Sequence, residues 1–414
     1  MHQKASPLRV LYSFPHRIGA NRICYAAWQH VQGLAKAGAS VIACPASVSR
    51  PLDSSVRVIP TLSIGPLRLP FRLVGRTVAC TIHDWIVAQH VKRFASEIDL
   101  VHTFPLGALR TLKMAKSLGI PTILERCNAH TEFAYTIVQK ECEKLGISMP
   151  PGHEHDFNAA YLAKEEAEYR EADFLFCPSE FVARTFKDRG FPEAKLGRFQ
   201  YGFDEKTCYP PPSRQRTDNG LTVLFSAGCA PRKGLHYALE AWLKSPAHKQ
   251  GKFLVVGEFI PGYAERLGTM LQHPSVQILG YRKDLPDIMR QSDILVLPSI
   301  EEGSALVTYD ARGCGAVLLV SDASGAVCQD RVNALVHPAG DVAMLSRHIT
   351  ELHENRALLE QLRAASLTTA HELRWSAAGG HMMREYLRLM KVFRGGAANS
   401  FTVAARTVKE DNTH

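Results

Sequence analysis

The sequence predicts an α/β protein in which two doubly wound parallel sheets face each other across a cleft. Short apolar strands alternate with helical stretches along most of the 414 residues. The alternation stops in a polar, proline-bearing stretch near residues 203–220 and then restarts. Such alternation is typical of parallel sheets joined by right-handed helical crossovers. The length is sufficient for two domains with separate cores.

The first half begins with a strand–helix–strand unit. Val10–Phe14 is expected to be a buried strand, Gly19 lies in the loop after it, and a helix is expected over Ile23–Ala37. Gly38 ends that helix before the next strand, Val41–Ala43. The later strands of this half are expected at Leu100–His102, at Ile123–Leu124 and at Phe174–Cys177. The last of these is apolar throughout, so we expect it in the middle of the sheet.

The second half repeats the pattern after the linker. Its strands are expected at Thr222–Ser226, Phe253–Val256, Val276–Leu279, Ile294–Leu297 and Val317–Val320. We therefore expect two Rossmann-like domains, at residues 1–205 and 206–375, with ligands bound where the strands end. An amphipathic helix over residues 376–394 is expected to pack back on the first domain. Residues 395–414 are small and polar and are expected to form a flexible tail.

The composition of the chain limits where the protein is expected to act and what it is expected to bind. The chain has no apolar run long enough to span a bilayer and no signal-peptide pattern, so we expect a cytoplasmic protein. Its ten scattered cysteines suit reduced, buried thiols. The formal net charge is +9, and basic residues gather in the first hundred residues. The stretch Pro66–Arg93 is interpreted either as a helix lying on an anionic membrane surface or as a core helix with a solvated basic edge. Nucleic-acid binding is not expected, because no basic run is interleaved with stacking aromatics.

The segment Leu297–Gly315, LPSIEEGSALVTYDARGCG, carries the strongest chemical signal. A strand ends, a short loop bears Glu302, and a helix begins near Ala305. Amides at a helix N-terminus bind anions, and a glycine lets a phosphate approach the backbone. The candidate donor-binding residues here are Gly303, Ser304, Ala305 and Asp310. Two carboxylates, eight residues apart, are placed to hold hydroxyls at the two ends of a nucleotide-sugar.

A second segment, Gly228–Gly234, reads GCAPRKG and follows another strand. A leaving diphosphate needs positive charge, which Arg232 and Lys233 supply. Gly228 lies at the start of this loop as a further donor-binding candidate.

Together these segments resemble the retaining glycosyltransferases of family 4, the group 1 type, which have the GT-B fold. Glu302 and Asp310 match that family's E-x7-E pattern, with the second acid one methylene shorter. The resemblance implies that Glu302 contacts the donor sugar and Asp310 the ribose. Lys233 and Gly234 match the family's basic loop, but Cys229 stands where the family has an arginine, so we expect Arg232 to take that role.

In the first half, the segment Ile123–Thr131 runs from a strand into polar residues. The family often has a histidine here that contacts the donor sugar, and His130 is the candidate, with Asn128 as the alternative. Gly19 occupies the place of the family's glycine-rich loop. A metal at His153–Asp156 is not expected, because the cluster lacks a distant fourth ligand.

The resemblance therefore implies a metal-independent hexosyltransferase without a cofactor. Its catalytic candidates are Glu302, His130, Lys233 and Arg232. The donor is expected to be a UDP- or GDP-sugar, and the acceptor a glycan, lipid-linked and used in surface-polysaccharide synthesis at the inner face of the cytoplasmic membrane. Two alternatives stay open: a nucleotide-sugar epimerase of the same fold, and a catalytically silent nucleotide-sugar-binding subunit.

Overall fold

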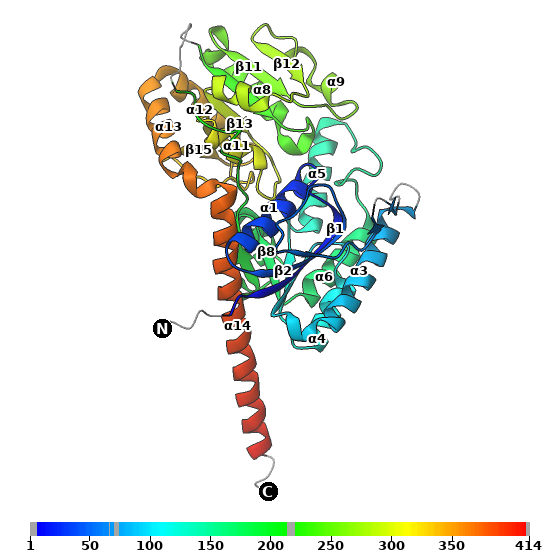
Figure 1. Cartoon of the computed structure of the whole chain (residues 1–414). Helices are drawn as coiled ribbons and strands as arrows, with labels where there is room; N and C mark the ends of the chain where they lie inside the picture. Colours follow the sequence, from blue (N-terminus) through cyan, green and yellow to red (C-terminus); the bar gives the residue numbers. More distant parts are fainter. Residues whose placement is uncertain (1–5, 66, 70–73, 213–219, 411–414) are drawn as a thin grey trace.

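The computed structural model describes residues 6–65, 67–69, 74–212 and 220–410. The chain forms two lobes, each built on a parallel sheet flanked by helices (Figure 1). The predicted α/β class, with two parallel sheets and a helix crossing back, is confirmed.

The N-terminal sheet has seven strands in the order β3-β2-β1-β6-β7-β8-β9, and every neighbouring pair is parallel. The strands are β1 (Arg9–Ile18), β2 (Ser40–Val48), β3 (Arg57–Val58), β6 (Leu100–Thr103), β7 (Thr122–Glu125), β8 (Phe174–Cys177) and β9 (Leu196–Arg198). As expected from its apolar sequence, β8 lies inside the sheet, between β7 and β9. A small antiparallel hairpin, β4 (Ser63–Ile64) with β5 (Leu67–Arg68), stands apart from the sheet.

Helices connect these strands and cover the sheet. They are α1 (Ile23–Lys36), α3 (Arg76–Arg93), α4 (Leu109–Ser117), α5 (Thr131–Leu145), α6 (Ala159–Glu171) and α7 (Glu180–Lys187), with short 3-10 turns η1 (Ala95–Glu97) and η2 (Glu193–Lys195). In α3 the buried acid Asp84 interrupts the apolar face because it caps α4. Its carboxylate accepts the amides of Arg110 and Thr111, each at 2.9 Å.

The C-terminal sheet has six parallel strands in the order β12-β11-β10-β13-β14-β15. They are β10 (Thr222–Ser226), β11 (Lys252–Val256), β12 (Val276–Gly280), β13 (Ile294–Leu297), β14 (Val317–Ser321) and β15 (Ala334–His337). The helices around it are α8 (Leu235–Lys244), α9 (Tyr263–Leu267), α10 (Leu285–Gln291), α11 (Leu306–Gly313), α12 (Val342–Glu354) and α13 (Arg356–Ala370). The 3-10 turns are η3 (Pro231–Lys233), η4 (Pro246–Lys249), η5 (Gly268–Met270) and η6 (His371–Leu373).

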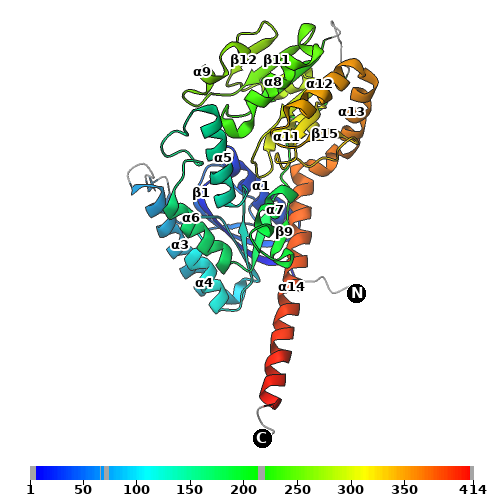
Figure 2. The ribbon, with the colours of Figure 1, turned by 180° about the vertical axis from the view of Figure 1, so that it is seen from behind.

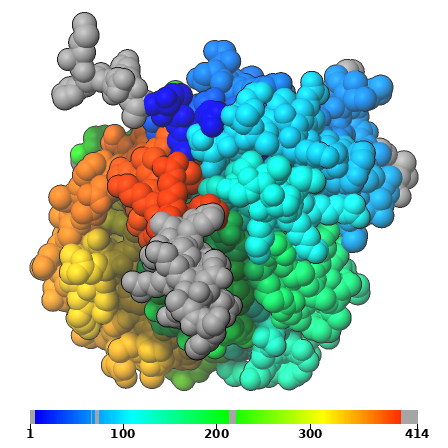
Figure 3. Space-filling model, turned by 90° about the horizontal axis from the view of Figure 1, so that it is seen from below, coloured from blue at the N-terminus to red at the C-terminus, as the bar shows by residue number. Residues whose placement is uncertain are grey.

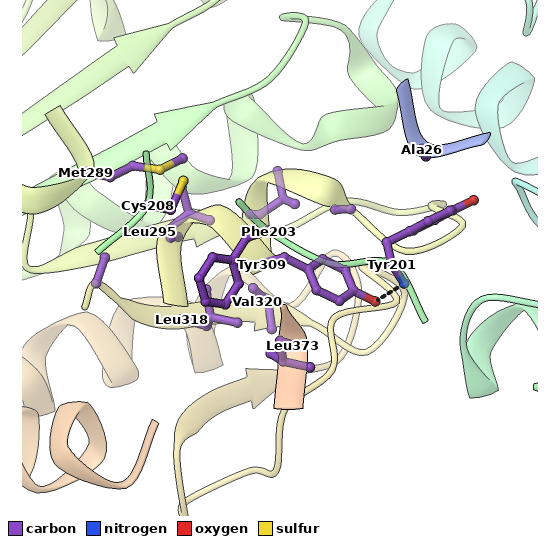
Figure 4. Packing of buried hydrophobic residues seen from close by; sticks show 14 of the residues in the cluster. Ala26, Tyr201, Phe203, Cys208, Met289, Leu295, Tyr309, Leu318, Val320 and Leu373 are labelled. Atoms are coloured by element: carbon purple, nitrogen blue, oxygen red, sulfur yellow. Dashed lines mark hydrogen bonds between the residues drawn. The ribbon is translucent and has the colours of Figure 1, made fainter. Parts of the chain in front are cut away.

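The chain crosses between the lobes twice, and the two crossings pair with each other. The Phe203 amide donates to Leu373 O at 2.9 Å, and the Trp375 amide donates to Phe203 O at 3.2 Å. A Cβ on Gly202 would lie 2.6 Å from the Trp375 nitrogen, so glycine is needed for this approach. Figure 4 shows Phe203 and Tyr201 beside Tyr309 of the C-terminal domain, and Cys208 beside Met289 and Leu295. The Tyr201 amide donates to the Tyr309 hydroxyl at 3.3 Å. The first crossing is therefore part of the core rather than a loose connection.

The last helix, α14 (Trp375–Glu410), runs from the C-terminal lobe along the N-terminal one (Figure 2). Seen from below, its red-orange residues lie between orange residues of the C-terminal lobe and blue residues of the N-terminal lobe (Figure 3). Gly33 of α1 and Gly379 of α14 meet there: a Cβ on Gly379 would be 2.5 Å from the Gly33 Cα. The helix continues to Glu410, past the expected end at residue 394. Within the described ranges, no helix has the length and apolarity needed to cross a membrane.

Candidate functional site

A cavity of about 790 Å³ lies between the two sheets. Its N-terminal wall comes from the ends of β1, β6 and β7 and from the loop 146–158 that joins α5 to α6. Its C-terminal wall comes from the loops after β10 and β13. Both walls therefore lie where parallel strands end, which is the expected place for a ligand in such sheets.

Two adjacent cations define the C-terminal wall. Arg232 and Lys233 lie on η3, directly after β10, and both line the cavity. Gly234 follows at φ +70°, and a Cβ there would meet Pro298 O at 2.1 Å, so the turn requires glycine. Cys229 is buried in the core, and Arg232 occupies the cavity as expected from the sequence.

Glu302 faces these cations. Arg232 Nη1 donates to Glu302 Oε2 at 3.1 Å, and Lys233 Nζ forms an ion pair with the same carboxylate. Burial, reinforced by the charge of Arg232, holds the pKa of Lys233 well below its usual range. In this structure the carboxylate of Glu302 is therefore engaged by both basic side chains.

Glu301, which the sequence analysis did not select, accepts hydrogen bonds from three residues. Its buried side chain accepts the Ala129 amide on Oε1 and His155 Nε2 on Oε2, each at 3.1 Å. Arg232 Nη1 donates to the same Oε2 at 3.1 Å and to the Glu301 carbonyl at 2.9 Å. Burial alone raises the pKa of this carboxyl, but these donors lower it to about 2. The acid is therefore ionised across the physiological range.

Gly303 is needed for a different reason from the one predicted. A Cβ there would lie 1.6 Å from the carbonyl oxygen of Cys127, which belongs to the other domain. The close approach that requires glycine here is between two backbones, and Gly303 is not among the residues that line the cavity. Ser179 Oγ also donates to Gly303 O at 2.6 Å across the same boundary.

The start of α11 remains a suitable anion site. Ser304 and Ala305 line the cavity, as do the first-turn residues Leu306 and Val307. Ser304 Oγ donates to Gly325 O at 2.7 Å, which fixes the turn, and no side chain caps the helix. The Ala305 amide donates to Ser324 O at 3.3 Å and the Thr308 amide to Ala305 O at 2.9 Å, so the first-turn amides of Leu306 and Val307 are the ones left to bind an anion.

Asp310 lies on α11 but does not line the cavity. Its Oδ1 accepts from Cys208 Sγ at 3.6 Å, on the side of the interdomain crossing. Burial raises the pKa of this carboxyl to about 6. The structure therefore does not bring the two acids of the E-x7-E pattern together in one cavity.

His130 is also placed away from the cavity, contrary to the predicted contact with the donor sugar. It caps α5 by accepting the Glu132 amide on Nδ1 at 3.3 Å, and its ring packs on Tyr169 and Phe186. Burial lowers its pKa to about 3. Asn128, the alternative residue, does line the cavity.

Of the two remaining glycines that the sequence analysis selected, one lines the cavity and the other does not. Gly228 lines the cavity, and a Cβ on it would meet nothing within 4 Å. Gly19 lies outside the lining; it has φ +80°, and its carbonyl accepts Arg50 Nε at 2.9 Å. Gly19 therefore shapes the loop that leads to Arg22, which does line the cavity.

The N-terminal wall contains a polar network that the sequence did not reveal. Arg126 pairs with Glu165 at 3.3 Å and donates to Thr131 Oγ1 at 3.1 Å, while its buried Nε has no partner. Two further guanidinium groups, Arg22 and Arg76, line the same wall. Among the described residues, no carboxylate lies within ion-pair distance of either, so this wall offers free positive charge. In the same ranges, no cluster of three or more possible metal ligands occurs.

The architecture defines the class: two Rossmann-like domains with a cavity between their strand ends form a GT-B fold. It is similar to the crystal structure of the Anabaena protein HepE in complex with UDP, at a TM-score of 0.61 and 16% identity, covering 92% of this chain and 99% of that one. Residues 220–355 match the family described as Glycosyl transferases group 1. The chain therefore has the GT-B fold, and residues 220–355, within its C-terminal domain, are of the Glycosyl transferases group 1 type.

Curated relatives match shorter stretches. The chain is 39% identical over 96 residues to the N,N'-diacetylbacillosaminyl-diphospho-undecaprenol alpha-1,3-N-acetylgalactosaminyltransferase of Campylobacter jejuni, covering 22% of this chain and 24% of the relative. It is 30% identical over 178 residues to the phosphatidyl-myo-inositol mannosyltransferase of Mycobacterium leprae, covering 40% of this chain and 46% of the relative. The matches thus span less than half the length of these two relatives.

Proposed function

We propose that this protein transfers a sugar from a nucleotide-diphosphate sugar to a glycan acceptor, with retention of configuration and without a metal. The observation that carries the proposal is the placement of Arg232, Lys233 and the start of α11 around one end of the cavity. Two side-chain cations and free helix amides together suit a diphosphate. The UDP bound to the structurally similar HepE protein supports a UDP-sugar donor, with a GDP-sugar as the alternative.

The donor is expected to rearrange the ion pairs. As its diphosphate takes Arg232 and Lys233, Glu302 loses these partners and its carboxylate becomes able to accept hydroxyls of the transferred sugar. The two cations then stabilise the charge that develops on the leaving diphosphate. We infer that the leaving phosphate oxygen takes the acceptor proton on the same face of the sugar, since Glu302 is committed to binding.

The acceptor is proposed to bind the N-terminal wall. Its free guanidinium groups, Arg22 and Arg76, suit a phosphorylated or diphospholipid-linked acceptor. The relatives named above act on diphospho-undecaprenol and phosphatidyl-inositol acceptors, which supports a lipid-linked substrate in surface-polysaccharide synthesis.

A peripheral membrane contact is part of the proposal. The tip of the β4–β5 hairpin and the outer face of α3 expose five large apolar side chains: Ile64, Leu67, Val78, Ile82 and Trp85. Leu62, directly before the hairpin, and Ala79 of α3 belong to one small buried cluster, so the hairpin lies beside α3. Exposed Arg68, Lys92 and Arg93 add positive charge to this part of the protein surface. An apolar face with a basic edge suits an anionic bilayer, and we place the surface at the inner face of the cytoplasmic membrane.

The test is a donor panel. The purified protein is incubated with UDP-, GDP-, ADP- and dTDP-sugars, and both thermal shift and release of the nucleoside diphosphate are measured. The proposal expects one donor to stabilise the protein and to be hydrolysed slowly, and Glu302→Ala to remove the hydrolysis. A donor that binds without turnover, even with membrane extract as acceptor, favours the silent subunit. Conversion of a donor into its epimeric nucleotide-sugar by the protein alone favours the epimerase. If no donor binds, the cavity assignment is wrong.

A further inference from the structure

Glu301 stands at the boundary between the two domains. It comes from the loop after β13, yet each of its carboxylate oxygens accepts a hydrogen bond from the N-terminal domain: Ala129 N–H donates to Oε1 and His155 Nε2–H to Oε2, both at 3.1 Å. Both side chains, Glu301 and His155, are buried. These bonds are formed only while the lobes are closed on each other.

The same carboxylate holds the donor-facing cation. Arg232 Nη1 is bonded to Glu301 at two oxygens, the carbonyl and Oε2, and to Glu302 at one. When a diphosphate displaces Glu302, the bonds to Glu301 remain. Arg232 then keeps its position instead of following the departing carboxylate.

His155 links Glu301 to the N-terminal wall of the cavity, where the acceptor is proposed to bind. It belongs to the loop 146–158, which contributes Gly152, His153, Glu154, Asp156 and Asn158 to the N-terminal wall of the cavity. His155 stands between two carboxylates: its Nδ1 lies 3.7 Å from Glu154 Oε1, and its Nε2 lies 3.1 Å from Glu301 Oε2, to which Nε2–H donates. The bond across the boundary therefore fixes a loop that lacks regular structure of its own.

We propose that Glu301 is a positioning residue that couples closure of the domains, and the seating of loop 146–158, to the placement of Arg232 on the donor diphosphate. The inference rests on the proposed function for its donor, and it adds an acid outside the family pattern described above. Removing the Glu301 carboxylate leaves buried donors without an acceptor on both domains, which favours separation of the two domains.

Calorimetric titration with UDP and with GDP tests the positioning. Simple electrostatics predicts that Glu301→Gln binds a diphosphate more tightly, because a negative charge leaves the site. Our inference predicts the opposite: the Kd of the nucleotide that wild type binds rises by about tenfold, the worth of one charge-assisted hydrogen bond. Glu240→Gln, which removes an exposed charge that pairs with Lys244 on α8, is the matched control and is expected to keep the wild-type Kd.

His155 gives an independent pair of variants on the other domain. His155→Gln keeps a side-chain N–H that reaches Glu301 and is expected to stay within about threefold of the wild-type Kd. His155→Ala is expected to behave like Glu301→Gln, and the double variant to be no worse than either single one. Unchanged or tighter binding in Glu301→Gln, or equal effects of His155→Gln and His155→Ala, overturns the proposal.

Hydrogen exchange separates this inference from the proposed function, because it needs no ligand. In full-length Glu301→Gln and His155→Ala, amides of residues 146–158 are expected to exchange at least tenfold faster than in wild type, with exchange in β10 and β13 unchanged. If wild type binds neither nucleotide, the proposed donor fails while the exchange result still decides whether Glu301 seats the loop. Unchanged exchange in loop 146–158 contradicts that role whatever the nucleotide result.

Discussion

Replacing Gly303 by alanine tests the closed arrangement of the two domains. The added Cβ would lie 1.6 Å from Cys127 O and 2.6 Å from the carbonyl carbon of the same residue. Both neighbours are backbone, so no side chain can rotate away. To restore a normal contact near 3 Å, the two backbones have to separate by more than about 1 Å, a displacement that typically costs a reacting site about a hundredfold in rate.

The expected result is a loss of function with the fold retained. Nucleoside diphosphate release by Gly303→Ala should fall about a hundredfold, while the melting temperature drops only by a few degrees, because each lobe keeps its own core. Gly380→Ala adds the same methyl group on α14, where the nearest atom would be Arg384 Nη1 at 3.7 Å. This control should keep full activity and be slightly more stable. Near wild-type turnover in Gly303→Ala would show that the closed contact is not part of the working state.

Three further predictions concern packing, pH and the membrane. Gly379→Ala inserts a Cβ 2.5 Å from the Gly33 Cα and should lower the free energy of unfolding in urea by about 1–3 kcal/mol; unchanged stability would contradict the helix contact. Burial raises the pKa of Asp310 from 3.8 to about 6. The protonated side chain therefore contributes its full share of the folding stability below about pH 4, and this contribution is lost as the pH rises through about 6. Asp310→Asn should therefore melt above wild type at pH 8, with the difference shrinking toward pH 4; a constant difference would refute the assignment. Trp85→Ser should reduce sedimentation with phosphatidylglycerol vesicles about fivefold or more, because an exposed apolar contact is lost; unchanged sedimentation would exclude Trp85 from the membrane contact.

The fold was predictable because each lobe repeats one local pattern. Apolar runs such as Phe174–Cys177 and Ile294–Leu297 coincide with observed strands, since a strand buried on both faces leaves little choice of residue. The two-residue strands and the hairpin β4–β5 were not predicted, because they are too short to show a period. The end of α14 was also missed, because the small residues after Gly395 carry no apolar stripe.

The site could be predicted from the sequence where its residues directly follow strands of a single sheet. Arg232, Lys233 and Glu302 lie together as expected, since each follows a neighbouring strand of one sheet. His130 could not be distinguished from a ligand by sequence, because its role as a helix cap depends on how α5 starts.

Contacts between the domains were beyond sequence reasoning. The partners Glu301 and His155 are 146 residues apart in the chain, and only the closed fold brings them together. An acid directly beside Glu302, and a histidine in a polar loop, were the available signals. The requirement for glycine at position 303 could not be predicted either, because the neighbouring residue, Cys127, belongs to the other lobe.

The central claim is that the cavity binds a nucleoside diphosphate through the cations after β10. The most direct measurement is a calorimetric titration of wild type and Lys233→Gln with UDP and GDP, with Lys252→Gln, at the exposed start of β11, as the control. The account predicts that one nucleotide binds wild type and the control equally, and binds Lys233→Gln at least about tenfold more weakly. Equal affinity for all three proteins, or no binding to wild type, would contradict it.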